Sequence, residues 1–285
     1  MNNNFIWRIN RLRAYLYQSV GVLKSRFARG EKINAYWYDR IVNFGDLLTP
    51  SILIQLGLIP INSNKNDSDI ISTGSILDNL SEDYNGYIIG SGLMYDVKRK
   101  FPNAKIRAVR GELTRSRIGA PMNIVLADPG IIADDLIKER LEKKYELGIV
   151  PHYMDKNNEN IKHIFNRYYK EILIIDVQRN PKQVISDIDK CCFILSSSLH
   201  GLVVADSLDI PNAWVVLSDK VLGNGFKFYD YQSAFYRETG PYKISGYEKL
   251  NELRSITKKP HPIITDIKYN LHQVFNVFRD EYLTK

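Results

Sequence analysis

The sequence contains little cysteine. Only two of its 285 residues are cysteines, and they are adjacent, at Cys191 and Cys192. An adjacent pair inside an apolar run gives neither a disulfide framework nor the spacing of a zinc site. Scarce, unpaired cysteine favours a reducing compartment. No apolar run is long enough to span a bilayer, and no segment resembles a secretory signal, so we expect a cytoplasmic globular protein.

Several signatures of cofactor and metal chemistry are also missing. Residues 90–92 read Gly-Ser-Gly after an apolar run, but they lack the spacing of the dinucleotide fingerprint, and no phosphate-loop lysine follows them. No cluster of histidine, cysteine and carboxylate has the spacing of a metal site. No nucleophile-elbow serine is present. The sequence therefore predicts neither a bound metal nor a resident cofactor.

Basic charge is concentrated at one end of the chain. The formal net charge is +7, and residues 1–32 hold seven basic residues against one glutamate, or +6. Apolar residues in this segment recur at helical spacing: Phe5, Ile9, Leu12, Leu16, Val20, Leu23 and Phe27. We predict a basic amphipathic helix, either packed on its own domain or in peripheral contact with an anionic membrane. The near-neutral remainder disfavours nucleic-acid binding.

Beyond this segment, apolar strand-like runs alternate with helical patterns. Strand-like runs occupy residues 33–38, 69–73, 86–90, 105–109 and 123–127, and then 147–151, 171–177, 191–196 and 212–218. Helical patterns occupy residues 45–57, 112–119, 161–169, 181–189, 199–209 and 265–283. Near-continuous apolar strands between helices are typical of parallel sheets covered on both faces. The sequence therefore predicts an α/β fold.

The highly charged segment 137–146 predicts a domain boundary. On this basis we expect two Rossmann-like domains, residues 33–145 and residues 146–285, the second ending in the C-terminal helix. The domains are expected to face one cleft, because ligands of such sheets bind beyond the carboxyl ends of the strands.

Polar and small residues at those strand ends are the candidate site. The first half supplies Asn43, Gly45, Asp46, Gly90, Ser91, Gly92, Arg110 and Asp128; the second supplies Pro151, His152, Ser196, Ser197, Ser198, Leu199, His200, Lys227, Asp230 and Tyr231. Asp46 is predicted either as the N-cap of the helix over residues 45–57 or as a catalytic group.

The stretch FILSSSLHGLVVADSLD (193–209) joins a strand to a helix. The first N–H groups of that helix lack internal partners, so with the serine hydroxyls they form a natural anion site. His200, in the first turn, is suited to donate to a phosphate or carboxylate, or to pass a proton. The alternative is structural: serines that cap the helix and a histidine bonded to a backbone carbonyl.

Six segments occur in order along the chain: YWYDRIVNFGDLLTP (36–50), IIGSGLM (88–94), VRGELTRSRIG (109–119), ADPG (127–130), IVPHYMD (149–155) and SSSLHGLVVADSLDIP (196–211). Together they resemble the polysaccharide pyruvyl transferase family, especially the ketal-pyruvate transferases of exopolysaccharide and capsule synthesis. The resemblance covers residues 36 to about 231. It implies a fold similar to the two-domain, GT-B-like glycosyltransferases.

The resemblance also implies a reaction. The donor would be phosphoenolpyruvate, and no cofactor would be required. The acceptor would be a hydroxyl pair on a hexose of a bacterial surface polysaccharide precursor, expected to be lipid-linked, and the product a cyclic pyruvate ketal. A donor with a carboxylate and a phosphate needs cations and helix N-termini, which agrees with the strand-end residues. The sequence leaves open a sugar-nucleotide-dependent glycosyltransferase of the same architecture, and a non-catalytic scaffold.

Candidate roles follow. The catalytic candidates are His200 for proton transfer, Asp46 for acceptor positioning or base work, and His152 as a second acid or base. The substrate-binding candidates are Arg110, Ser197, Ser198, Leu199, Lys227, Asn43, Gly45, Gly92 and Tyr231. By the resemblance, Arg110 and the Leu199-His200 pair hold the donor. Many relatives carry arginine at the position of Ser198, so Lys227 and Arg115 are candidate replacements for that contact.

Overall fold

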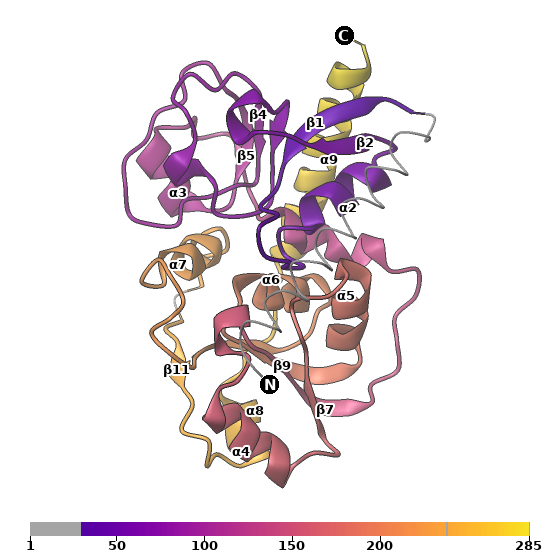
Figure 1. The fold of residues 1–285 in the computed structure, drawn as a ribbon, viewed down its shortest axis with the longest axis vertical. Helices are drawn as coiled ribbons and strands as arrows, with labels where there is room; N and C mark the ends of the chain where they lie inside the picture. The colour runs from indigo at the N-terminus through magenta and orange to yellow at the C-terminus, as the bar shows by residue number, and fades with distance from the viewer. Residues whose placement is uncertain (1–29, 238, 285) are drawn as a thin grey trace.

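The computed structural model describes residues 30–237 and 239–284. In that part of the chain, two parallel sheets lie one above the other (Figure 1). The six-stranded sheet has the order β2-β1-β3-β4-β5-β6, and the five-stranded sheet has the order β11-β10-β9-β7-β8. The α/β prediction with two parallel sheets is confirmed.

The first sheet is built from the first half of the chain. Its strands are β1 (Lys32–Tyr36), β2 (Ile59–Asn62), β3 (Ile70–Ile71), β4 (Tyr87–Ile89), β5 (Lys105–Val109) and β6 (Val125–Leu126), and its connections include α2 (Leu48–Gln55), α3 (Glu112–Ile118) and the 3₁₀ segments η1 (Lys65–Asp67), η2 (Leu77–Asn79) and η3 (Pro129–Leu136). Gly119 ends α3 with a left-handed φ of 64°, a conformation that glycine adopts without steric cost.

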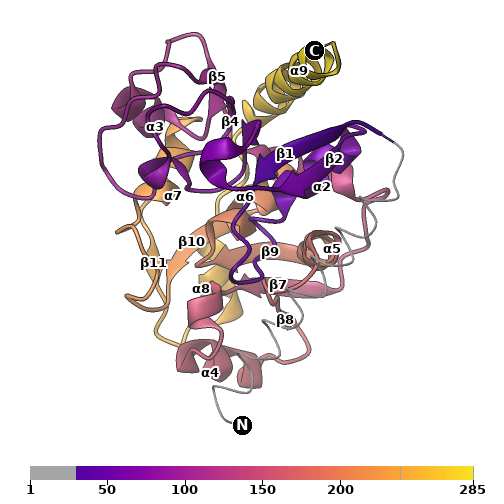
Figure 2. The ribbon, with the colours of Figure 1, turned by 45° about the horizontal axis from the view of Figure 1, so that its top comes forward.

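The second sheet follows in sequence. Its strands are β7 (Tyr145–Val150), β8 (Ile172–Ile174), β9 (Cys191–Ser196), β10 (Asn212–Val216) and β11 (Tyr242–Lys243), with helices α4 (Glu159–Arg167), α5 (Pro181–Asp189), α6 (Leu199–Ser207), α7 (Phe226–Ser233) and α8 (Leu250–Ser255) and the 3₁₀ segment η4 (Tyr153–Asp155). Asn158 and Asn180 cap α4 and α5 by accepting backbone N–H bonds. Figure 2 shows β7, β8, β9 and β10 side by side.

The two sheets are joined through a buried layer around α6. One hydrophobic core includes Ile33 from β1, Leu48 from α2, Ile132 from η3, and Val203 and Val204 from α6. Every residue of α6 is buried, which explains why its pattern is apolar on all sides rather than amphipathic. Since α6 packs on η3, its first turn is fixed relative to both sheets.

The C-terminal helix α9 (Ile264–Leu283) packs against the first sheet, although it follows the second in sequence (Figure 1). The rings of Phe278 and Tyr87 meet edge to face at 5.0 Å, and Glu281 pairs with Arg107 at 2.7 Å. Helix periodicity identified the helix but not its partner. The predicted domain boundaries, the facing cleft and the GT-B-like arrangement stay predictions.

Most of the predicted N-terminal amphipathic helix, residues 1–29, lies outside the described residues. Among the described residues, no helix is both long and apolar enough to cross a membrane. The choice between packing on the protein and lying on a membrane stays a prediction.

Candidate active site

His200 lies at the junction of the two sheets, in the first turn of α6. Its Nε2 is 3.7 Å from Oδ2 of Asp128, and each of these buried atoms lacks a hydrogen bond in the described part of the chain. Asp128 is fully buried and His200 is 8% exposed. The end of β6 and the start of α6 thus bring a carboxylate and an imidazole together, as in catalytic sites where a carboxylate orients a histidine.

Gly45 lies directly against the other edge of the same ring. A Cβ at this position would be 2.0 Å from Nδ1 of His200, which no side chain tolerates. The neighbouring Phe44 ring meets the imidazole edge to face at 6.3 Å. The predicted residues Gly45 and His200 are therefore in contact, and glycine is required for that contact.

Asp46 belongs to the same group of side chains. Its Oδ2 accepts a 3.0 Å hydrogen bond from Nδ2 of Asn43. Burial raises the pKa of Asp46 to about 6, while the charges of His200 and Lys227 and the Asn43 hydrogen bond act in the opposite direction. The N-cap prediction for Asp46 is wrong: α2 begins after Leu47, and no side chain caps it. The turn before α2 instead places the carboxyl group beside His200.

Lys227 is a buried cation on α7. It is 8% exposed, and in the described residues its ammonium has no ion pair and no hydrogen bond, only the ring of Phe228 at 5.6 Å. Burial and, to a lesser extent, the charge of Arg110 lower its pKa to about 8, while Asp46 acts in the opposite direction. A buried, unpaired ammonium is costly and points to an anionic ligand.

Arg110 is fully buried and already bonded within the protein. Its Nε donates to Oδ2 of Asp230 at 2.9 Å, one terminal nitrogen donates to Ser75 Oγ at 2.6 Å, and the other donates to the carbonyl of Leu93. Gly92 lies so close to the guanidinium that a Cβ there would be 2.4 Å from Cζ. The structure therefore places the predicted donor-binding Arg110 as an anchor between β5 and α7.

The serine run is divided between structural and free hydroxyl groups. Ser197 Oγ accepts from the His152 N–H at 2.9 Å and donates to Asp155 Oδ2 at 2.7 Å, and Ser196 Oγ accepts from the Ser198 N–H at 3.0 Å. These bonds tie the ends of β7 and β9 together. Ser198, at the N-cap of α6, makes no side-chain cap bond, so its hydroxyl and the first N–H groups of α6 are available to a ligand. Leu199 is buried in the core.

His152 lies close to this group but turns one nitrogen toward its own backbone. Its Nδ1 accepts from the N–H of Met154 at 3.3 Å, and its ring lies 4.3 Å from that of Tyr153. Burial and, to a lesser extent, the charge of Lys227 lower the pKa of His152 to about 4, while Asp155 acts in the opposite direction. His152 is therefore neutral near pH 7 and is not suited to supply a proton.

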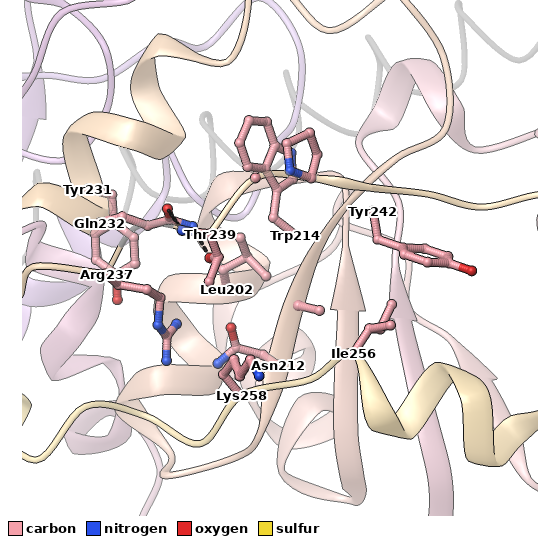
Figure 3. Close-up of a pocket in the computed structure, with 13 residues that line it drawn as sticks. Leu202, Asn212, Trp214, Tyr231, Gln232, Arg237, Thr239, Tyr242, Ile256 and Lys258 are labelled. Carbon is pink, nitrogen blue, oxygen red and sulfur yellow. Dashed lines mark hydrogen bonds between the residues drawn. The ribbon is translucent and has the colours of Figure 1, made fainter.

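Tyr231 and Arg115 are not brought into this group. The Tyr231 hydroxyl donates to Asp206 Oδ2 at 2.8 Å, in the wall of a separate cavity of about 300 Å³ between α6, α7 and β10 (Figure 3). Arg115 bonds to Glu112 and to the Met122 carbonyl within the α3 region.

Three aspartates have no candidate role in the sequence prediction: Asp128, Asp230 and Asp155. The sequence predicts Asp128 only as a strand-end residue, and no sequence pattern indicates that it faces His200. Asp230 holds Arg110 and also accepts from Thr114 at 2.7 Å. Asp155, in IVPHYMD, accepts from Ser197 and Ser218. An aspartate directly after a predicted strand or within a candidate motif is the signal that could have identified the first and third.

Comparison with known proteins gives matches over most of the chain. The sequence model of the family described as polysaccharide pyruvyl transferase matches residues 7–219. An uncharacterised protein of Acanthamoeba polyphaga mimivirus is 35% identical over 175 residues, 57% of this chain and 59% of that protein. The succinoglycan biosynthesis protein ExoV of Rhizobium meliloti is 27% identical over 205 residues, 69% of this chain and 62% of that protein.

The chain spans about three fifths of the length of each of these relatives. A crystal structure of an uncharacterised Klebsiella pneumoniae protein aligns with 86% of this chain and 100% of that chain, at 12% identity and a TM-score of 0.41, a likeness too low to carry an argument. The family match covers well over half of the chain and includes the segments that hold His200, Asp128 and Asp46. The chain belongs to the polysaccharide pyruvyl transferase family.

Proposed function

We propose that this protein transfers the pyruvyl group of phosphoenolpyruvate to two hydroxyls of a hexose in a surface polysaccharide precursor, forming a cyclic ketal. The observation that carries the proposal is Lys227, a buried lysine whose ammonium has no anionic partner in hydrogen-bond range among the described residues. Family membership supports the reaction class. The relative named as a succinoglycan biosynthesis protein supports a polysaccharide acceptor, with a lipid-linked repeat unit as its proposed form.

The donor is a small anion with two acidic groups. Lys227, the Ser198 hydroxyl and the first N–H groups of α6 form a cationic, hydrogen-bonding site for one of them. His200 lies in the first turn of α6, next to these N–H groups. A donor bound there lies beside His200, whose ring contacts Gly45 and lies 3.7 Å from Asp128.

The chemistry takes one proton from each acceptor hydroxyl and delivers one proton to the methylene carbon and one to phosphate, with no net change of oxidation state. One acceptor hydroxyl adds to the central carbon of the donor while the methylene carbon gains a proton and becomes a methyl group. The bond from the central carbon to the phosphate oxygen then breaks, the second hydroxyl adds to that carbon, and its proton leaves with phosphate. We assign proton donation to His200 and proton acceptance from a hydroxyl to Asp46, whose raised pKa of about 6 suits a base near neutral pH.

The test is turnover by the full-length chain. Phosphoenolpyruvate is incubated with galactoside and glucoside acceptors, including lipid-linked forms, while phosphate release is followed and products are examined by mass spectrometry and NMR. The expected result is one phosphate released per pyruvate ketal formed. Release of nucleoside diphosphate from a sugar nucleotide, with no consumption of phosphoenolpyruvate on any acceptor, would replace this proposal with a glycosyltransferase.

A further inference from the structure

Asp128 has one oxygen fixed by the backbone and one oxygen with no hydrogen bond. Its Oδ1 accepts the N–H of Gly130 at 2.9 Å, at the start of η3. Its Oδ2 is buried and has no hydrogen-bond partner in the part of the chain that the structure describes. Such an orphaned carboxylate oxygen in a fully buried side chain is unusual, because burial without a hydrogen bond costs free energy.

The atom that faces this oxygen is equally unsatisfied. Nε2 of His200 lies 3.7 Å from Oδ2 and is itself buried without a hydrogen bond among the described residues. The His200 side chain nevertheless keeps 10% exposure, so its accessible part lies elsewhere on the ring. Hydrogen bonds between catalytic groups are often long in ligand-free structures and tighten in the complex.

The two ring nitrogens therefore have different surroundings. Nε2 lies 3.7 Å from the carboxylate, and Nδ1 lies against Gly45, where the ring takes the space that a Cβ would occupy. Asp46 interacts electrostatically with His200 and with Lys227, and Lys227 also feels the charge of Arg110. An ionised carboxylate only accepts hydrogen bonds, so it favours the ring form that carries its proton on the facing nitrogen.

We propose that Asp128 is a positioning residue that holds a proton on Nε2 of His200, so that Nδ1 is the nitrogen that exchanges protons with the substrate. The role in turnover rests on the proposed function, whereas the ring form itself does not. The carboxylate is well placed for this, because the Gly130 bond and the packing of Gly130 against Val203 of α6 fix η3 relative to the histidine.

The ring form can be read directly in the protein without any substrate. In ¹⁵N-histidine-labelled full-length protein at about pH 9, where imidazole rings are neutral, long-range ¹⁵N–¹H spectra distinguish the two forms, and His200→Ala identifies the signal among the five histidines. We expect His200 with hydrogen on Nε2. Hydrogen on Nδ1 would overturn the proposal, whether or not phosphoenolpyruvate is the donor.

The variant Asp128→Asn tests the role of the carboxylate. The asparagine oxygen can keep the Gly130 bond, but its amide group then donates toward Nε2 and reverses the preferred ring form. We expect the NMR pattern of His200 to reverse and kcat to fall about 100-fold or more, with little change in KM for phosphoenolpyruvate. A rise in KM for phosphoenolpyruvate with unchanged kcat would contradict the assignment, and so would an unchanged ring form of His200.

A matched control is present in the same protein. Asp135 faces Nε2 of His272 at 3.0 Å, between η3 and α9, where both side chains are partly exposed. Asp135→Asn removes a comparable histidine–aspartate contact away from the candidate site, and we expect it to leave kcat and the His200 signals unchanged. An equal loss of kcat in both variants would show that Asp128 acts only through the stability of η3, and would overturn the proposal.

Discussion

Arg110 Nε lies 2.9 Å from Asp230 Oδ2, and both side chains have no solvent exposure. This ion pair joins the end of β5 to α7, and the backbone oxygen of Asp230 lies so close to Gly111 that a Cβ there would be 1.7 Å away. The pair therefore fixes α7, and with it Lys227, over the first sheet. Its main role is to position the cation that we propose binds the donor.

Arg110→Ala is expected to destabilise the protein strongly, because it leaves the Asp230 carboxylate buried and unpaired. The free energy of unfolding should fall by about 3–5 kcal/mol. Urea denaturation of the single variants and of Arg110→Ala with Asp230→Ala gives the coupling, and the double variant should lose less than the sum. Normal stability with abolished donor binding would instead make Arg110 a direct ligand.

Lys227→Met should weaken donor binding without destabilising the protein, the reverse of the result expected for Arg110→Ala. The substitution removes the ammonium of a buried lysine that has no ion pair among the described residues, so stability should be equal or higher. Affinity for phosphoenolpyruvate should fall about 10- to 100-fold, the usual value of a hydrogen bond to a charged group. Isothermal titration calorimetry measures the affinity, and exposed Lys220→Met is the control. Unchanged affinity would remove Lys227 from the donor site.

Asp46→Asn should change stability in a pH-dependent way. Because the folded-state pKa is about 6, above its ordinary 3.8, ionised Asp46 disfavours the folded state above about pH 6, and this cost disappears as the pH falls below the unfolded pKa. The variant should therefore be more stable than the native protein at pH 7, by at most about 3 kcal/mol in free energy of unfolding, and the two should converge near pH 4. Thermal melting curves of both proteins between pH 4 and pH 7 measure this difference. A variant with a lower melting temperature than the native protein at pH 7 would contradict the burial of this carboxylate.

Gly45→Ala should displace the His200 ring. The added methyl group would meet Nδ1 at 2.0 Å, so we expect a loss of about 1–3 kcal/mol of stability, typical of overpacking, together with loss of transfer activity. Gly240→Ala is the matched control, because a Cβ there meets nothing within 4 Å. If Gly45→Ala retains full activity, His200 does not act from the position seen here.

The sequence predicted the strands and helices that have strong patterns, and it missed those that do not. β2 contains Pro60, and β11 has only two residues, both exposed, so neither shows the apolar run of a central strand. The sequence predicts no helix at α7, because its buried residues Lys227, Phe228, Asp230 and Tyr231 mix polar and apolar types and form no separate apolar face.

The sequence predicted which residues lie at the strand ends, but it did not predict which of these side chains contact one another. The rule that parallel strands end at one edge groups Asp46, His200 and Lys227, and the structure places Asp46 within electrostatic range of the other two. It could not show that Arg110 forms an ion pair with Asp230, or that the Tyr231 hydroxyl bonds to Asp206 rather than facing the candidate site. Those outcomes depend on how α7 packs, and residues 110 and 230 are too far apart in sequence for any local pattern to report their contact.

The most direct test of the account is a crystal structure of the full-length protein with bound phosphoenolpyruvate. The account predicts the donor at the first turn of α6, with one acidic group at Lys227 and the Ser198 hydroxyl, and its methylene carbon on the Nδ1 side of His200. Donor density elsewhere, such as in the cavity beside Tyr231, with Lys227 still unpaired, would contradict it.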